Sequence, residues 1–203
     1  MRPDFNHREA GYTILPGRFQ PPHNDHVALV REVATTVPPP LYLGLIVHAP
    51  DLAADPDAHM GLDSEARQHN QPERNPFTFA ERHAMWQYIL ARELADVPAP
   101  IILALPRPES AWSWITSVFP GQRTWIVPDC GEAFDDMKAR FLSCKGDRVA
   151  RVAQRPTTDG RQVRALLGDP ARLATHVPPS VAACVAAFNR FLPAKEIPCR
   201  LVS

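Results

Sequence analysis

Cysteine is scarce in this sequence, and its spacing shows no metal or disulfide signature. The 203 residues include four cysteines, and no two of them form a Cys-x-x-Cys pair. Zinc sites and disulfide scaffolds are usually recognised by closely paired cysteines. We therefore expect neither, and we expect the four thiols to be reduced and buried, as most free cysteines are.

Long apolar runs are also missing. The longest, Leu41 to Val47 and Ile101 to Leu105, are far shorter than the ~18 residues that a membrane-spanning helix needs. The first residues, MRPDFNHREAG, are polar and lack the apolar core of a secretory signal. We expect a cytoplasmic protein with no membrane partner.

Charge of either sign is not in excess. The chain has 22 basic and 22 acidic side chains, whereas proteins that bind nucleic acid usually show a strongly basic face. We therefore expect a small-molecule partner and no nucleic acid. The length fits a single domain over residues 1–203, since domains have about 100–200 residues, and it leaves a homo-oligomer open. Proline is abundant at 23 residues, which favours stiff loops.

Short apolar runs alternate with amphipathic segments along most of the chain. The expected strands are 12–15, 41–48, 101–105, 124–127 and 149–152, and the expected helices are 25–36, one that begins at Thr78, 111–119, 134–142, 159–168 and 181–188. Thr78 with Glu81, and Asp159 with Gln162, match capping boxes. This alternation predicts an α/β fold: a Rossmann-like, doubly wound parallel sheet of about five strands with C-terminal helices. Its ligand crevice should lie at the carboxyl ends of the strands.

The segment 49–74 interrupts this pattern. It is rich in Asp, His, Pro, Gly and Gln, and it is longer than the connections that compact domains normally contain. We expect a flexible insertion, either a lid or a disordered segment. His48, Asp51, His59 and His69 offer metal ligands but no compact spacing, so we predict no zinc site.

The loop after the first expected strand has the strongest chemical signal. It reads GRFQPPHNDH from Gly17 to His26 and places His23 and His26 at the start of a helix. Both imidazoles can face one anion beside the positive end of the helix dipole. The Arg18 guanidinium suits bidentate phosphate contacts, and Gly17 lets the backbone approach a ligand. The sequence has no Gly-x-Gly-x-x-Gly and no Walker loop, so hydride transfer and P-loop hydrolysis lose their main support.

This loop resembles the Gly-Arg-Phe-Gln-Pro-x-His-x-Gly-His signature of nicotinamide mononucleotide adenylyltransferases, especially the archaeal type and its bacterial relatives. Two further segments are similar to motifs of that family, in the same order. RNPFT at 74–78, followed by Glu81 and Arg82, resembles its Asn-Pro-Phe-Thr-x-x-Glu-Arg element, and 160–164, followed by Val177 and Pro178, resembles its Ser-Gly-Thr-x-x-Arg helix. The resemblance spans about residues 12–190 apart from the insertion.

The resemblance implies a reaction and a set of site residues. In that family the phosphate of a nucleotide attacks the α-phosphate of ATP in line and pyrophosphate leaves, so the implied reaction joins ATP and nicotinamide mononucleotide into NAD. Mg²⁺ would arrive with the triphosphate, without a dedicated metal site in the protein. The implied catalytic residues are Arg18, His23, His26 and Arg164; the implied nucleotide and phosphate contacts are Gly17, Phe19, Gln20, Asp25, Arg155 and Arg161; the implied acceptor contacts are Asn75, Arg82 and Trp114. Trp114 fits a core position equally well.

Two departures from the family pattern affect these expectations. Asp25 replaces the glycine between the two histidines, and Asp159 and Arg161 replace a serine and a threonine. Asp25 adds negative charge near the phosphates, so it either caps the helix or reshapes the nucleotide site; we favour reshaping because Arg161 supplies a compensating charge. Two alternatives stay open: a relative that uses another triphosphate, such as CTP, with another phosphate or phosphonate acceptor, and a nucleotide-binding module without catalysis.

Overall fold

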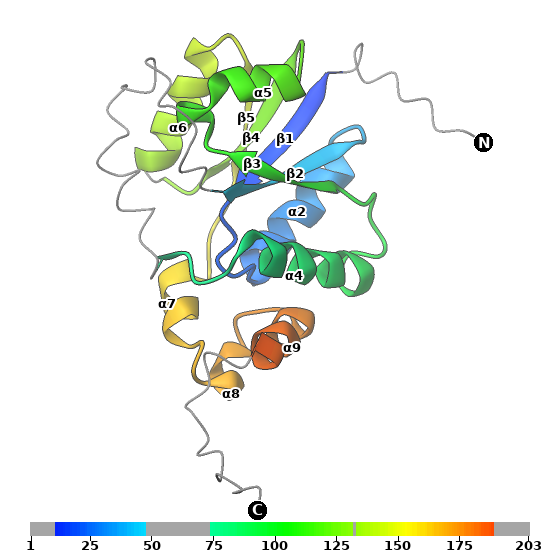
Figure 1. The fold of residues 1–203 in the computed structure, drawn as a ribbon, viewed down its shortest axis with the longest axis vertical. Helices are drawn as coiled ribbons and strands as arrows, with labels where there is room; N and C mark the ends of the chain where they lie inside the picture. The colour runs from blue at the N-terminus through cyan, green and yellow to red at the C-terminus, as the bar shows by residue number, and fades with distance from the viewer. Residues whose placement is uncertain (1–10, 48–73, 132, 189–203) are drawn as a thin grey trace, which may run out of the picture.

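The computed structural model describes residues 11–47, 74–131 and 133–188, which form five strands and a set of helices (Figure 1). The elements follow the order β1 (Tyr12–Gly17), α2 (Asn24–Thr36), β2 (Leu41–Val47), α4 (Phe79–Arg92), β3 (Ile101–Pro106), the 3-10 turn η3 (Pro108–Ser110), α5 (Trp112–Val118), β4 (Arg123–Asp129), α6 (Ala133–Cys144), β5 (Arg148–Ala153), α7 (Gly160–Ala165), α8 (Pro170–Leu173) and α9 (Pro179–Phe188). Strands and helices alternate as the sequence predicts.

The five strands form one parallel sheet with the order β3-β2-β1-β4-β5. In the register of this sheet, Ile14 of β1 lies opposite Tyr42 of β2 and Trp125 of β4. The chain builds outward from β1 to β3 and then returns to the other side of β1, so the winding reverses between β1 and β4. The predicted doubly wound parallel sheet is confirmed, and ligands in such sheets bind at the carboxyl ends of the strands beside this reversal.

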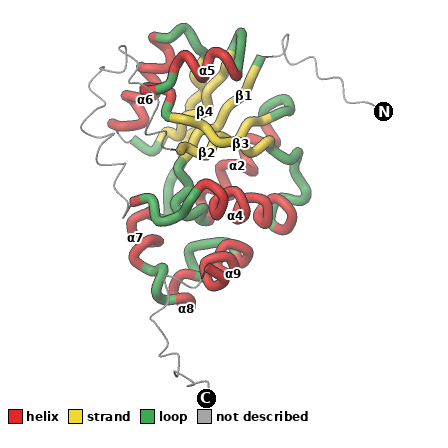
Figure 2. Tube along the Cα trace, in the orientation of Figure 1, coloured by secondary structure: helices red, strands yellow, loops and turns green. Residues whose placement is uncertain are grey.

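Helices cover both faces of the sheet. Helices α2 and α4 lie on one face and α5 and α6 on the other (Figures 1 and 2). Because side chains alternate along a strand, Leu15 packs in the core on the α2 and α4 side, while its neighbour Ile14 packs in the core on the α5 and α6 side. Helix α9 packs on α4 and extends the first core, which brings the C-terminal helices to the α4 side of the molecule.

The C-terminal region and the turn after β3 depart from the expected elements. The helix expected over 159–168 ends at Ala165, and η3 and α8 are additional. Both begin with a proline in their first turn, where the missing N–H and fixed φ of proline favour a helical start. The capping box of Thr78 and Glu81 is confirmed. Asp159 caps α7 through the N–H of Arg161 instead of that of Gln162.

Three free cysteines lie in the described part of the chain. Cys184 is buried, Cys130 is half-buried and Cys144 is exposed. The expectation of buried thiols is therefore right for Cys184 and wrong for Cys144, which is exposed at the last residue of α6.

The expected insertion at 49–74 lies outside the described residues except for Arg74, and so do the four possible metal ligands between positions 48 and 69. Within the described ranges, no helix is long and apolar enough to cross a membrane.

Candidate functional site

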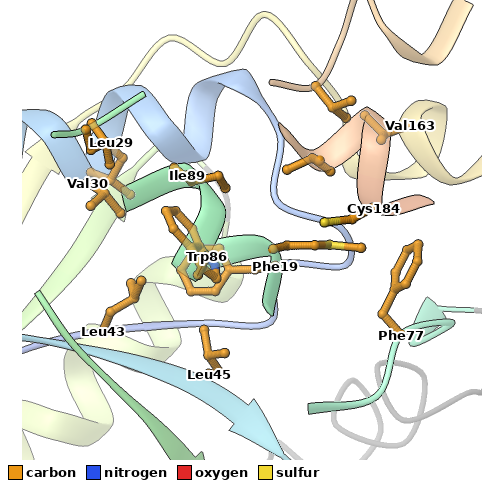
Figure 3. Close-up of a cluster of buried hydrophobic side chains, with 14 of the residues drawn as sticks. Phe19, Leu29, Val30, Leu43, Leu45, Phe77, Trp86, Ile89, Val163 and Cys184 are labelled. Carbon is orange, nitrogen blue, oxygen red and sulfur yellow. The ribbon is translucent and has the colours of Figure 1, made fainter. Parts of the chain in front are cut away.

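The loop between β1 and α2 turns on Phe19, whose backbone has a φ of 49°, in the left-handed region. Its side chain is buried, with the ring edge-on to Trp86 at a centroid distance of 5.0 Å (Figure 3). A Cβ at Gly17 would lie 2.3 Å from this ring, so glycine is needed there to admit Phe19. Phe19 is thus a core residue that shapes the loop, and its expected contact with nucleotide stays a prediction.

Two other expected ligand contacts hold the loop against the segment that precedes α4. The Gln20 amide donates to the carbonyl of Phe77 at 2.9 Å and accepts from its N–H at 3.0 Å. The buried Arg82 side chain donates to the carbonyl of Arg18 at 2.6 Å. Gln20 and Arg82 therefore position the loop, and their expected ligand contacts stay predictions.

The two histidines form one unit at the start of α2. The His23 and His26 rings stack with centroids 3.6 Å apart. The backbone N–H of His23 donates to Nδ1 of His26 at 3.2 Å. A neutral imidazole whose Nδ1 accepts a hydrogen bond has its proton on Nε2. His26 therefore offers an Nε2–H donor for a ligand.

Both imidazoles are neutral at physiological pH. Burial lowers the pKa of His23 to about 4, against the opposing effect of Asp25 and Asp159. Burial, followed by the neighbouring His23 and Arg18, lowers the pKa of His26 well below its usual range. His23 is buried, and its Nδ1 has no hydrogen-bond partner among the described residues. The pair can donate N–H groups to an anion without carrying charge beforehand.

Arginine side chains surround this loop. Burial and then the charges of nearby arginines lower the pKa of Arg18 to about 10; these neighbours are Arg164, Arg107, Arg74 and Arg82. Arg164 also donates to the carbonyl of Gln20 at 3.3 Å. Like charges held together destabilise one another and are relieved by a bound anion. This group of arginines is therefore suited to a ligand with several negative charges, such as a triphosphate.

Sequence reasoning assigned no role to two of these arginines. Arg107 directly follows β3 and pairs with Glu109 at 2.8 Å, and Arg74 stands at the start of the RNPFT segment. A signal for Arg107 was present, because the first polar residue after a parallel strand faces the carboxyl edge of the sheet. His176 was missed as well: it acts on the pKa of His23, and its carbonyl accepts from the N–H of Asn24.

Asp25 points toward the connection between β5 and α7. Its carboxylate accepts hydrogen bonds from the N–H groups of Thr157 and Thr158 and from the Thr157 hydroxyl, each at 2.8 Å. Arg161 instead lies exposed, with Nε 3.4 Å from the Asp159 carboxylate. The donors to Asp25 are therefore threonines, and Arg161 pairs with Asp159.

Three further expected site residues are Asn75, Arg155 and Trp114. Asn75 is half-buried just before Phe77, and Arg155 is exposed in the β5–α7 connection. Trp114 is half-buried on α5 and packs against the core on that face of the sheet. Their roles as ligand contacts stay predictions, while Arg18, His23, His26 and Arg164 lie close enough to influence one another's charge.

The residues near the loop do not form a metal cage. Within the described ranges there is no group of three or more His, Cys, Asp or Glu side chains that could hold an ion. The two carboxylates that act on His23 are already engaged, Asp25 by threonine donors and Asp159 as the cap of α7.

The chain is similar to known proteins in its fold. No protein-family model matches the chain, and no curated protein matches it. Among solved structures, it is similar to Plasmodium falciparum nicotinic acid mononucleotide adenylyltransferase, solved in complex with APC. The TM-score is 0.55 at 10% sequence identity, over 89% of this chain and 96% of the other. The likeness shows the fold: this chain shares the parallel α/β architecture of that structure.

Proposed function

We propose that this chain is a nucleotidyltransferase. It transfers a nucleoside monophosphate from a triphosphate to a phosphate-bearing acceptor, and we take ATP and nicotinamide mononucleotide as the substrates and NAD as the product. The observation that carries the proposal is the stacked, neutral His23 and His26 pair beside Arg18 and Arg164. This group stands after β1, next to the reversal of winding where such sheets bind ligands. The shared fold of an adenylyltransferase supports the same assignment.

The proposed reaction needs little covalent help from the protein. An oxygen of the acceptor phosphate attacks the α-phosphorus, the bond from that phosphorus to the β-bridging oxygen breaks, and pyrophosphate leaves with the electron pair of that bond. Catalysis of such a transfer consists of positioning and charge stabilisation. We assign the Nε2–H of His26 and the ring of His23 to the triphosphate, where their N–H groups stabilise the charge that develops.

The arginines then divide the remaining charge. Arg18 lies at the centre of the cluster and is acted on by all four of its neighbours, so we assign it to the phosphate chain at the reacting end. Arg164 reaches the loop from α7, and we assign it to the departing pyrophosphate. Magnesium is treated as part of the substrate, the magnesium complex of the triphosphate, because phosphate oxygens and water are its usual ligands.

Pyrophosphate release over a substrate panel tests the proposal. The four common triphosphates are each combined with nicotinamide mononucleotide, nicotinic acid mononucleotide, simple phosphate monoesters and phosphonates, with magnesium present. We expect release with ATP and a pyridine mononucleotide, and loss of release in His26→Ala. Release with CTP and a different acceptor would support the alternative transferase. Tight ATP binding without release from any pair would show a binding module and overturn the proposed activity.

A further inference from the structure

Asp25 joins two parts of the chain that are far apart in sequence. It lies in the first turn of α2, and its hydrogen-bond partners Thr157 and Thr158 are 132 and 133 residues away. One carboxylate oxygen accepts both backbone N–H groups, and the other accepts the Thr157 hydroxyl. Hydrogen bonds to a charged acceptor are stronger than those between neutral groups, so this contact fixes the connection between β5 and α7.

The connection leads directly to Arg164. Asp159 follows Thr158 and caps α7, and α7 contains Arg164, which donates to the carbonyl of Gln20. The α7 region is therefore joined to the start of α2 through Asp25 and to the β1–α2 loop through Arg164. The charges of both side chains act on His23, in opposite directions.

Helix α7 needs such an anchor. It has six residues, and a helix of this length is not stable on its own. Val163 is buried in the core and holds its middle, while Asp25 holds the residues just before its start. Loss of the Asp25 contact should thus leave α7 packed through Val163 but let its first residues, and the guanidinium of Arg164, move.

We propose that Asp25 is a positioning residue that fixes the β5–α7 connection on α2 and so holds Arg164 in place for the phosphate chain next to His23. The proposal rests on the proposed function for the role of Arg164. The aspartate takes the place of a glycine in the family that the loop resembles, and a glycine has no acceptor for these N–H groups. The carboxylate therefore accepts hydrogen bonds from the connection. It supports anion binding by holding the segment that leads to Arg164.

Amide hydrogen exchange on the protein without ligand tests the contact itself. In Asp25→Ala we expect the amides of Thr157 and Thr158 to exchange about tenfold faster or more, because each loses a hydrogen bond to a charged acceptor. Thr157→Val is the matched variant, since it removes the hydroxyl and keeps both N–H groups. The exchange rates of the amides at positions 157 and 158 should change much less in this variant. Unchanged exchange in Asp25→Ala would overturn the inference, whatever the enzyme does.

Binding of inorganic pyrophosphate tests the positioning of Arg164. By calorimetry, we expect Asp25→Asn to weaken binding about tenfold, within the range of coupling through a positioning contact. The same change made in an Arg164→Ala background should weaken it less than about twofold, because the group being positioned is already gone. A merely structural role would give equal losses in the two backgrounds.

Asp96→Asn is the control for the loss of one negative charge, since Asp96 pairs with Arg31 on the surface; it should bind as the parent does. Equal losses from Asp25→Asn with and without Arg164, together with normal pyrophosphate binding by the parent, would overturn the positioning role and leave the proposed function standing. Failure of the parent chain to bind pyrophosphate or any triphosphate would instead overturn the proposed function, and the role of Asp25 toward Arg164 with it.

Discussion

Arginine occupies both ends of the parallel sheet, but its partners differ. At the amino end, Arg123 begins β4 and makes two hydrogen bonds to the carboxylate of Asp147, at 2.7 and 2.8 Å, and a third to the carbonyl of Phe119. Trp125 donates its indole N–H to the same carboxylate. Both side chains of the ion pair are buried, so the charge of Arg123 is matched within the fold.

At the carboxyl end, arginines gather around Arg18 and lower its pKa. Two of them, Arg82 and Arg164, donate to backbone carbonyls of the β1–α2 loop. A carbonyl orients a guanidinium without cancelling its charge, whereas a carboxylate does both. The carboxylate at the amino end therefore stabilises the fold, whereas the arginines around Arg18 at the carboxyl end are suited to binding an anion.

The largest effect on stability should come from breaking the buried ion pair of Arg123 and Asp147 at the amino end of the sheet. Asp147→Ala leaves Arg123 buried without its carboxylate, and we expect the free energy of unfolding to fall by about 3–5 kcal/mol. Urea denaturation measures this. Asp96→Ala removes a carboxylate from a surface pair and should leave the free energy of unfolding nearly unchanged. If the two substitutions lowered the free energy of unfolding equally, the buried ion pair would contribute no more to stability than the surface pair.

The next largest effect concerns the histidines at the carboxyl end of the sheet, where a substitution should lower activity instead of stability. In His26→Ala the loss of one preorganised donor should lower the turnover number about 100- to 1000-fold, measured as pyrophosphate release. His83→Ala is the control, because His83 lies on α4 against Phe79. Turnover within twofold of the parent in His26→Ala would remove His26 from the mechanism.

The free energy of unfolding should also fall at acid pH because His23 is buried as a neutral imidazole. Above pH 6.5 the folded and unfolded chains both have neutral His23, so no stability is lost. As pH falls from 6.5 toward 4, the unfolded chain binds a proton that the folded chain excludes, because burial lowers the pKa of His23 to about 4. This difference amounts to about 3 kcal/mol at the acid limit.

Urea denaturation between pH 7 and 4 measures the acid effect, with His23→Asn as the comparison. The substitution should flatten the curve, and pyrophosphate should reduce the loss in the parent, because a bound anion favours the protonated imidazole. Parallel curves for the parent and His23→Asn would show that His23 does not set the pH dependence.

The smallest effect should come from removing one charge of the arginine cluster. Arg164→Gln should weaken pyrophosphate binding about tenfold, or about 1.4 kcal/mol, and the difference should shrink as salt is added. The free energy of unfolding without ligand should stay within about 0.5 kcal/mol, since the change also relieves repulsion. Arg172→Gln is the control, because Arg172 is exposed on α8 beside Asp169. A salt-independent loss would show that Arg164 acts through shape and not through charge.

Much of the fold could be predicted from local pattern. The strands, the winding of the sheet and the Thr78 cap follow from apolar runs and helical spacing that act over a few residues. The loop with His23 and His26 was found in the same way, because its residues are consecutive. The additional η3 and α8 were missed, since helical turns this short have almost no periodicity.

The arrangement of the site depended on contacts between distant segments. Sequence alone did not show that Phe19, Gln20 and Arg82 hold the loop in place, because a motif does not reveal the contacts between its segments. The partners of Asp25 lie more than 130 residues away, where no local pattern reaches. Local sequence therefore determined the elements and the chemistry of the loop, and tertiary packing decided which side chains are buried beneath it and which charges remain to meet an anion.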